Sequence, residues 1–480
     1  MVQQVQTVVK RLRGKWSLVQ WVIWGLINVT VASYFGFALL APASDIKTAW
    51  LPGTTTHGHY QIELDCNACH ASSSGEGEPS ADDVMQDACN RCHADQLKMV
   101  RDTHPAKKFN DPTNADLLLV LDAQNCLSCH EEHVPRQTNP MGLTMPTDYC
   151  WHCHQDVAES RPSHEGMRFD SCATAGCHNY HNNLALYEKF LGDHADEPDF
   201  LDVSFVLARD TAGGLSDSSW PKPELRLVDA DHPSTVDATE DLLNDWADTS
   251  HATAGVNCTH CHASTGEDGA ELVGGGWKDN VSMDACKTCH ENQVASFQRG
   301  KHGMRLASGL PAMTPSNARL PMHAGAAHAE MTCNACHAGH RFDTQFAATE
   351  ACLQCHADDH SLAYRETSHA KAWADEMTGA AAANSGVSCA TCHLPRLDGD
   401  DGVFVQHDQN SNLRPNETMA REVCLNCHGL EYSLSSLADP DSVRNCFGEP
   451  PAERNVSVRM AKEWFESKAK KRRSRGSSSG

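Results

Sequence analysis

The 480-residue chain is poor in the side chains that build a hydrophobic core: aromatic residues make up 6% of it and hydrophobic residues 40%. Its mean hydropathy is −0.48, so apolar side chains alone supply little material for an interior. Positive charge is also scarce, with 39 Lys and Arg against 63 Asp and Glu and a net charge of −24. Binding to nucleic acid requires a basic face that neutralises phosphates, so this balance excludes nucleic acid as a partner.

Cysteine and histidine, in contrast, are abundant, with 23 and 29 copies. An intrinsically disordered acidic chain would not carry this much cysteine, and a disulfide-rich secreted domain would be much shorter. The cysteines are spread along the chain rather than crowded into one small scaffold. We therefore expect that something other than side chains fills the interior.

A long run without charge lies near the N-terminus, from Trp16 to Ala41. As a helix it would rise about 39 Å, which exceeds the roughly 30 Å of a hydrocarbon core. The basic residues before it are Lys10, Arg11, Arg13 and Lys15. We predict a single N-terminal anchor in a bacterial inner membrane, with everything after Asp45 in the periplasm. The alternative is a cleaved signal peptide, for which the small residues of Ala41-Pro42-Ala43 are suited.

One short motif, C-x-x-C-H, recurs along the rest of the chain. Its ten copies are Cys66/Cys69/His70, Cys89/Cys92/His93, Cys126/Cys129/His130, Cys150/Cys153/His154, Cys258/Cys261/His262, Cys286/Cys289/His290, Cys333/Cys336/His337, Cys352/Cys355/His356, Cys389/Cys392/His393 and Cys424/Cys427/His428. An eleventh, Cys172/Cys177/His178, has four residues between the thiols. Together they use every cysteine except Cys446.

C-x-x-C-H is the attachment signature of c-type haem. The two cysteines form thioethers with the porphyrin, and the adjacent histidine becomes the proximal iron ligand. Zinc binding or thiol redox chemistry would explain paired cysteines, but neither explains a histidine after every second cysteine. We therefore predict eleven covalently attached haem c groups, which would also supply the missing core. Cys446 is interpreted as a small, partly buried residue, with a mixed disulfide to a partner as the alternative.

The motif array resembles the multihaem c-type cytochromes, and the longer loop of Cys172/Cys177 resembles a spacing in the class III tetrahaem cytochromes. The resemblance implies haems in close contact that pass electrons along the chain, and in some members a catalytic haem. It implies a mostly α-helical, haem-packed architecture with extensive loops and little β structure, here preceded by a transmembrane helix. Short helices that carry the motif histidines should alternate with loops.

Eighteen histidines remain for the second axial position of the irons. Four follow a motif histidine by three or four residues: His133, His181, His340 and His360. A partner one helical turn away cannot easily reach the opposite face of the same haem, so each is expected to ligate a neighbouring haem.

Four further histidines, His164, His251, His302 and His369, share a recurring polar context. This context resembles distal-ligand segments of multihaem reductases and hydroxylamine-oxidoreductase-like proteins. The other candidates are His57, His59, His104, His323, His328 and His407, with a surface histidine or a haem-propionate partner as the alternative for each. His152 and His260 lie inside attachment loops and are less suited.

The longest interval between motif histidines, from His178 to His262, divides five haems from six. The predicted organisation is a basic flank and anchor at 1–43, a five-haem domain at 44–195, an acidic linker or small β excursion at 196–248, a six-haem domain at 249–435, and a C-terminal helix with a basic flexible tail at 436–480. Short strands are expected at Val203–Leu207 and Glu224–Val228, with irregular chain as the alternative.

The C-terminal segment from Pro451 onward is predicted to be helical, with Met460, Trp464 and Phe465 on one face. Six basic residues follow: Lys468, Lys470, Lys471, Arg472, Arg473 and Arg475. Without these six and the four basic residues at the N-terminus, the rest of the chain has a net charge of −34. The tail is suited to an anionic lipid surface or an acidic partner, or is simply solvated.

These features favour a periplasmic electron carrier, with no catalytic residue, between the quinol pool or a quinol-oxidising membrane protein and a terminal reductase in anaerobic-type respiration. One alternative is a multihaem oxidoreductase with one open iron, acting on nitrogen or sulfur oxyanions or resembling hydroxylamine oxidoreductase. No C-x-x-C-K occurs in the chain, which disfavours the form of open site used by pentahaem nitrite reductases. The third hypothesis is a structural role, as a scaffold or a filament subunit.

Overall fold

The computed structural model describes residues 18–40, 51–70, 81–102, 104, 109, 112–119, 121–134, 142–161, 164–168, 180–182, 186, 188–202, 222–263, 276–399, 402–413, 416–454 and 456–477. Within them the chain is mostly helical, with one two-stranded hairpin, which confirms the predicted fold class.

Most elements are a few residues long. In the N-terminal half the helices are α2 (Leu18–Leu40), η2 (Tyr60–Ile62), α3 (Cys66–Cys69), α4 (Ala81–Met99), η3 (Pro112–Asn114), α6 (Ala115–Leu118), η4 (Cys126–Ser128), α7 (Trp151–His154), α8 (Val157–Ser160) and α9 (Glu188–Asp193). The next group is η8 (Leu227–Asp229), α10 (Glu240–Ala247), α11 (Ser250–Thr253), α12 (Cys258–His262), α13 (Met283–Lys287), α14 (Glu291–Arg299), α15 (Met304–Ala307), η9 (Pro315–Asn317), η10 (Ala324–Ala326), α16 (Cys333–His337), α17 (Thr344–Ala348), α18 (Glu350–Cys355), α19 (Asp359–Ala363), η11 (Tyr364–Glu366) and α20 (Ser368–Met377). The last group is α21 (Cys389–His393), β1 (Arg396–Gly399), β2 (Gly402–Val405), α22 (Asn410–Leu413), α23 (Thr418–Glu422), η12 (Cys424–Asn426), α24 (Leu430–Ala438), α25 (Pro440–Arg444) and α26 (Val456–Ser477).

The attachment motifs coincide with single helical turns. In six of them the histidine N–H donates to the carbonyl of the first cysteine, at 2.8–3.0 Å: His70, His130, His154, His290, His356 and His428. Residues three and four apart on a helix share a face, so this turn presents both thiols and the imidazole to the same side. The expected alternation of short motif helices and loops is confirmed for the described motifs except the second, which lies within the 19-residue α4.

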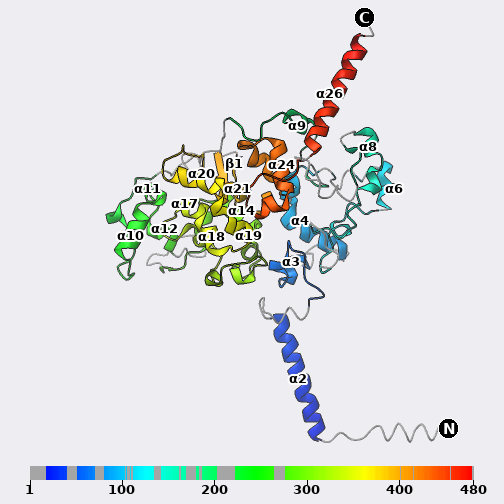
Figure 1. Ribbon diagram of the computed structural model, residues 1–480. Coiled ribbons are helices and arrows are strands. Elements are labelled where there is room, and N and C mark those ends of the chain that lie inside the picture. The colour runs from blue at the N-terminus through cyan, green and yellow to red at the C-terminus, as the bar shows by residue number, and fades with distance from the viewer. Residues whose placement is uncertain are drawn as a thin grey trace, which may run out of the picture.

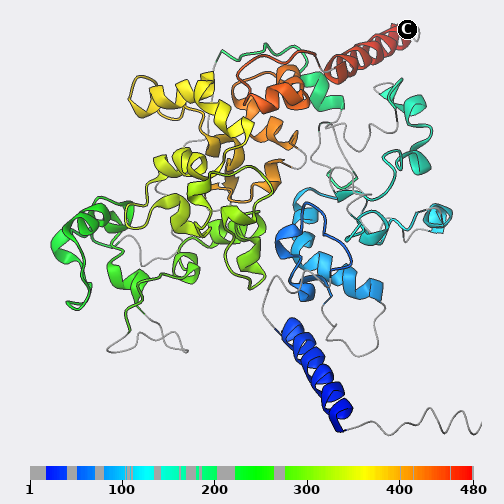
Figure 2. The ribbon, with the colours of Figure 1, turned by 60° about the horizontal axis from the view of Figure 1, so that its bottom comes forward.

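Helix α2 extends away from the rest of the molecule (Figures 1 and 2). Its apolar segment, Val19–Phe37, is not buried at all against the protein. Trp21 and Phe37, for example, are exposed. The sequence prediction of a long apolar helix here is confirmed.

A conventional hydrophobic core is formed where α9, α23, α24 and α26 meet. Leu430, Leu434 and Val458 are its most buried large side chains. Helix α26 begins on α9, where a Cβ at Gly192 would lie 2.8 Å from the Phe465 ring. It then projects outward at the opposite end of the molecule from α2 (Figure 1). The predicted C-terminal helix is therefore confirmed.

The strand expected at Glu224–Val228 is wrong. This stretch is extended only as far as Arg226, and the turn of η8 follows. A single bond, from the N–H of Leu225 to the carbonyl of Ala252, joins it to another segment, and a lone extended stretch without a ladder partner does not form a sheet. The strand predicted at Val203–Leu207 lies outside the described residues. The hairpin that does form pairs Arg396 with Val405 and Gly399 with Gly402.

The two halves of the chain are joined by contacts around η2. Lys301 donates from Nζ to the carbonyls of His57 and Gly58, at 2.7 and 2.6 Å, and Arg305 donates to the carbonyl of Gln61 at 2.8 Å. The Arg319 guanidinium lies 4.2 Å from the centre of the Tyr60 ring. Both ribbon views accordingly show α3 and α4 beside the C-terminal half (Figures 1 and 2).

Candidate functional site

Nine motif histidines each face a second imidazole. The pairs, with the distances between ring centroids, are His93 and His59 (5.9 Å), His130 and His181 (6.3 Å), His154 and His104 (6.1 Å), His262 and His340 (5.8 Å), His290 and His251 (6.0 Å), His337 and His407 (6.3 Å), His356 and His302 (6.3 Å), His393 and His360 (5.9 Å), and His428 and His369 (6.2 Å). In each pair, the partner of the motif histidine is one that the sequence analysis names as a candidate iron ligand.

The spacing of these pairs fits an iron between the two rings. Metal–imidazole bonds of about 2.0 Å on opposite sides of one iron would place the two ring centroids about 6.3 Å apart. The observed 5.8–6.3 Å is too long for an imidazole–imidazole hydrogen bond and leaves space for a metal and the plane of a macrocycle.

The hydrogen bonds of the paired rings select the tautomer that binds metal. The Nδ1 atoms of nine paired rings lie 2.5–3.2 Å from oxygens that can only accept, so Nδ1 carries the proton: His59, His93, His104, His130, His181, His262, His360, His407 and His428. Nε2 then keeps its lone pair. This arrangement orients histidine ligands in metal sites.

Burial keeps the deepest of these imidazoles neutral. It lowers the pKa of His302 and of His393 to about 4, with neighbouring histidines adding to the shift. It also lowers the pKa of His251, His290 and His369. Only a neutral imidazole can ligate a metal, so these rings are ready ligands at neutral pH.

One continuous cavity of about 2120 Å³ runs through the C-terminal half. Five of the pairs line it: His262 and His340, His290 and His251, His337 and His407, His356 and His302, and His393 and His360. Its volume is more than twice the upper end of an ordinary small-molecule pocket, roughly 1,000 Å³. It therefore suits several large, flat groups rather than one substrate.

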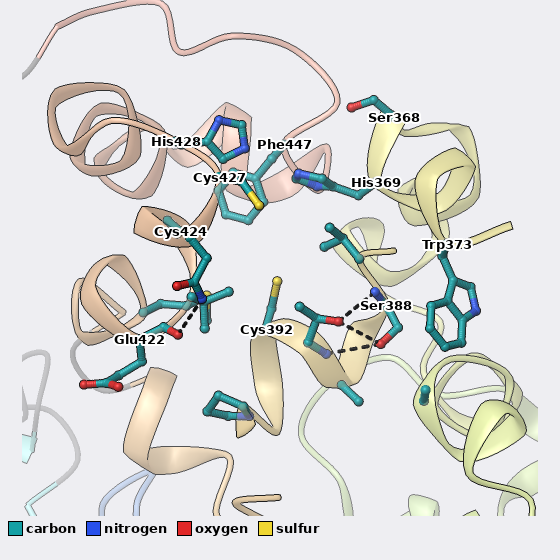
Figure 3. A pocket seen from close by; sticks show the side chains of 18 of the residues that line it. Ser368, His369, Trp373, Ser388, Cys392, Glu422, Cys424, Cys427, His428 and Phe447 are labelled. Carbon is teal, nitrogen blue, oxygen red and sulfur yellow. Dashed lines mark hydrogen bonds between the residues drawn. The ribbon is translucent and has the colours of Figure 1, made fainter. Parts of the chain in front are cut away.

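The last pair lies in a smaller cavity of about 430 Å³ (Figure 3). His369, from α20, and His428 enter it from opposite walls, and Cys424 and Cys427 lie beside them. The backbone carbonyl of Asp199 accepts from Nδ1 of His428 at 3.1 Å and fixes this ring. Phe200 and Tyr432 pack against the same imidazole, with ring centroids 5.0 and 5.1 Å away.

Thiols of successive motifs lie next to one another. Cys286 is hydrogen-bonded to Cys333, Cys352 to Cys389, and Cys89 to Cys126. Burial raises the pKa of the Cys261, Cys336 and Cys392 thiols, and cysteines of the following motif are close enough to raise it further. The attachment points of the C-terminal half therefore form a series without interruption from Cys261 to Cys424.

Four of the predicted attachment cysteines are exposed, Cys66, Cys92, Cys153 and Cys289, and the first three do not line the two cavities described above. This differs from the interior position expected for the edge of a packed haem. At Cys92 and Cys153 the outer side of the turn faces solvent, since Arg91 and His152 are exposed as well. Haem attachment at these thiols, as at the other motif cysteines, stays a prediction.

Cys92 and Cys153 nevertheless lie close to residues of neighbouring haem-attachment sites. The pKa of Cys69 is raised mainly by burial, and charge on Cys92 adds to the shift. Burial likewise raises the pKa of Tyr180, with a smaller contribution from Cys153. The first and second motifs, and the fourth motif and Tyr180, are therefore neighbours.

Tyr180 links two pairs in the N-terminal half, and the sequence reasoning missed it. Its ring stacks on that of His104 at 4.1 Å and lies 5.0 Å from that of His181. Its carbonyl accepts from Nδ1 of His104 at 2.7 Å. Its position two residues after a motif histidine is the signal that could have identified it.

The remaining predicted residues are placed as follows. The predicted eleventh motif, Cys172, Cys177 and His178, lies outside the described residues, and His164 lies in the short described segment before it. The ring of His57 lies 5.8 Å from that of Tyr60. Among the described residues, neither His70 nor His328 has a ring contact with another imidazole. His133 donates from Nδ1 to the carbonyl of Gly53 at 2.8 Å.

Two family models match parts of the chain. The model of cytochrome c3 matches residues 58–155, which contain four motifs, and the model of cytochrome c554 and c-prime matches residues 285–350, which contain two. No curated protein matches the chain. The two matches, together with the repeated attachment motif, support a multihaem c-type cytochrome that transfers electrons and binds haem c covalently.

Proposed function

We propose that this chain is a membrane-anchored periplasmic cytochrome with eleven haems, which carries electrons from the quinol pool or a quinol-oxidising membrane protein to a terminal reductase. The observation that carries the proposal is the set of nine imidazole pairs with one spacing, in seven of which at least one ring is held through Nδ1. Haem iron held by two imidazoles supplies a one-electron change of valence at low potential without binding substrate.

In this proposal the motif cysteines hold the haems, and the second member of each pair is the sixth ligand. The chain's own groups do three things there. Carbonyl and carboxylate oxygens orient the imidazoles through Nδ1, burial keeps the imidazoles neutral, and packing excludes water from the cavity walls. No side chain has to react, so no catalytic residue is assigned.

The contacts between motifs support conduction along the whole C-terminal half. Each of the six attachment sites there adjoins the next through a pair of cysteines. In the N-terminal half Cys89 contacts Cys126. Tyr180 contacts His104 and His181, and so joins the sites of His154 and His130. The chain therefore arranges its redox sites in two runs.

The two runs meet at the site of His93. Its Nδ1 lies 2.6 Å from Oε1 of Gln96, and the Gln96 side chain is hydrogen-bonded to the carboxylate of Asp408, next to His407. Its pair partner His59 lies in the segment that Lys301 holds, next to His302. The N-terminal run thus joins the middle of the C-terminal run, and we propose a branched conductor with the branch at this site.

The arrangement of the two long helices supports the membrane part of the proposal. Helix α2 has the length and composition of a membrane span and exposes apolar side chains throughout. The basic helix α26 projects at the opposite end from α2 (Figure 1). This position favours our proposal that it meets an acidic protein partner rather than the membrane that α2 would enter.

Low-temperature EPR of the purified oxidised protein, with haem quantified on the same sample, tests the proposal. We expect eleven haems per chain and only low-spin ferric signals, because every iron is six-coordinate. A high-spin signal of about one equivalent that changes on addition of nitrite or hydroxylamine would contradict it and identify a catalytic iron. Protease treatment of intact spheroplasts tests the topology, since the haem domains should be digested from the periplasmic side.

A further inference from the structure

We propose that His133 is the sixth ligand of the iron attached at Cys66, Cys69 and His70. The inference rests on the ligand scheme proposed above. It concerns the one motif histidine among the described residues for which no imidazole pair is seen, and it assigns a partner from the attachment motif of another haem.

The first argument is a register that the other H-x-x-H motifs share. His181 follows the fifth motif and pairs with His130 of the third motif. His340 follows the eighth motif and pairs with His262 of the sixth. In both, the second histidine reaches the site two motifs earlier. His133 follows the third motif, so the same register assigns it to the first.

The spacing matters to this register. His360 follows its motif histidine by four residues rather than three, and it pairs with His393 of the next motif downstream. His133 has the three-residue spacing of His181 and His340. It also shares the backbone of His340: both adopt a left-handed conformation, with φ of 63° and 69°. Such residues turn their side chains out of the preceding helical turn, and a histidine adopts this conformation only where the surroundings hold it there.

The second argument is the orientation of the His133 ring. Its Nδ1 donates to the carbonyl of Gly53 at 2.8 Å, so Nε2 keeps its lone pair, as in the paired rings. The approach is close because residue 53 is a glycine: a Cβ there would lie 2.4 Å from the carbonyl oxygen of His133. Gly53 is therefore a positioning residue for this imidazole.

The third argument is location. Glu132, the residue before His133, accepts from the N–H of Thr56 at 2.6 Å and contacts Nδ1 of His59. Its carboxylate is close enough to Cys69 to act on that thiol electrostatically. The loop that carries His133 is thus tied to residues 53–59, which lead directly into the first motif.

The test uses the full-length, haem-loaded protein and the His133→Ala variant. We expect one of the eleven ferric haems to become high-spin in EPR, and the ferrous protein to bind one equivalent of carbon monoxide. His133→Met keeps a sixth ligand, so we expect it to stay low-spin while one haem moves to higher potential. His194→Ala is the matched control, because this histidine is not a candidate ligand and its Nδ1 contacts Glu197, and it should leave all haems low-spin.

A second background identifies which iron responds. Replacing Cys66 and Cys69 with Ser removes the first haem, and His133→Ala should then produce no high-spin signal. If His133→Ala alone leaves every haem low-spin while the unmodified protein is also fully low-spin, this inference fails and the electron-carrier proposal stands. If the unmodified protein already contains a high-spin haem that His133→Ala does not change, both fail.

Discussion

Gly429→Ala should selectively loosen the wall of the last site, because the segment 196–202 passes very close to this glycine. An added Cβ would lie 2.4 Å from the carbonyl oxygen of Pro198 and 3.0 Å from the Glu197 side chain. The φ of Gly429 is −70°, which alanine adopts freely, so the effect is purely steric. The backbone of segment 196–202 must move away.

The cost can be worked out from the bonds that this movement breaks. Those that join the segment to the site include Gly429 N–H to the Pro198 carbonyl, His428 Nδ1 to the Asp199 carbonyl, and Leu201 N–H to the Cys427 carbonyl, at 3.1, 3.1 and 2.9 Å. The Leu430 N–H also donates to the Glu197 carboxylate at 3.2 Å. Each is worth about 1 kcal/mol net, and an overpacked contact adds about 1–3 kcal/mol. Partial relaxation keeps some of these bonds, so we expect a loss of about 2–5 kcal/mol in the free energy of unfolding.

Urea unfolding of the haem-loaded protein, followed by circular dichroism, measures this loss, and EPR reports on the haem itself. The low-spin signal of one haem should broaden because the carbonyl that orients His428 is displaced. Gly325→Ala is the matched control, since a Cβ there meets nothing within 4 Å, and it should change stability by less than about 0.5 kcal/mol. Equal stability of the two variants would refute the close approach.

Three further outcomes are expected. Tyr364→Phe should cost about 1–2 kcal/mol in urea unfolding, because the buried hydroxyl donates to the Val387 carbonyl at 2.9 Å, and an unchanged midpoint would contradict this. Iodoacetamide should label the folded protein very slowly and the unfolded protein at one thiol, the buried Cys446, as read by mass spectrometry; labelling at the exposed Cys66, Cys92, Cys153 or Cys289 would mean missing haem attachments. Arg454→Ala should cost less than about 1 kcal/mol, and the difference should vanish in about 1 M salt, because its ion pair with Asp199 is exposed.

The parts of the site that are local in sequence were predictable. C-x-x-C-H closes within one helical turn, so the residues themselves specify which groups share a face. The apolar run of α2 and the helix of α26 are likewise local patterns. The histidines that form pairs could also be named from the sequence, because the partner of the motif histidine in each of the nine pairs was a candidate.

The pairing itself was not predictable, because it is set by tertiary contacts. His104 and His154 are fifty residues apart, and no sequence pattern predicts that their ring centroids lie 6.1 Å from one another. The surface position of Cys92 and Cys153 has the same origin, since the motif does not specify which side of its turn other segments will cover. The expected strand at Glu224–Val228 failed because a local alternation of side chains does not supply a neighbouring strand to pair with. Tyr180 was overlooked because its role depends on two rings from distant segments.

A chain whose C-terminal half lines a partly open cavity of about 2120 Å³ is not fully packed until that space is filled. Protein interiors do not sustain voids of this size, so before attachment the C-terminal half has no stable closed state to adopt. The thiols must therefore be delivered to the attachment machinery on an open chain, one motif after another, and compaction follows ligation. On this view a missed attachment is a defect of biogenesis as much as of conduction, and quality-control proteases would remove such molecules before they could carry an electron.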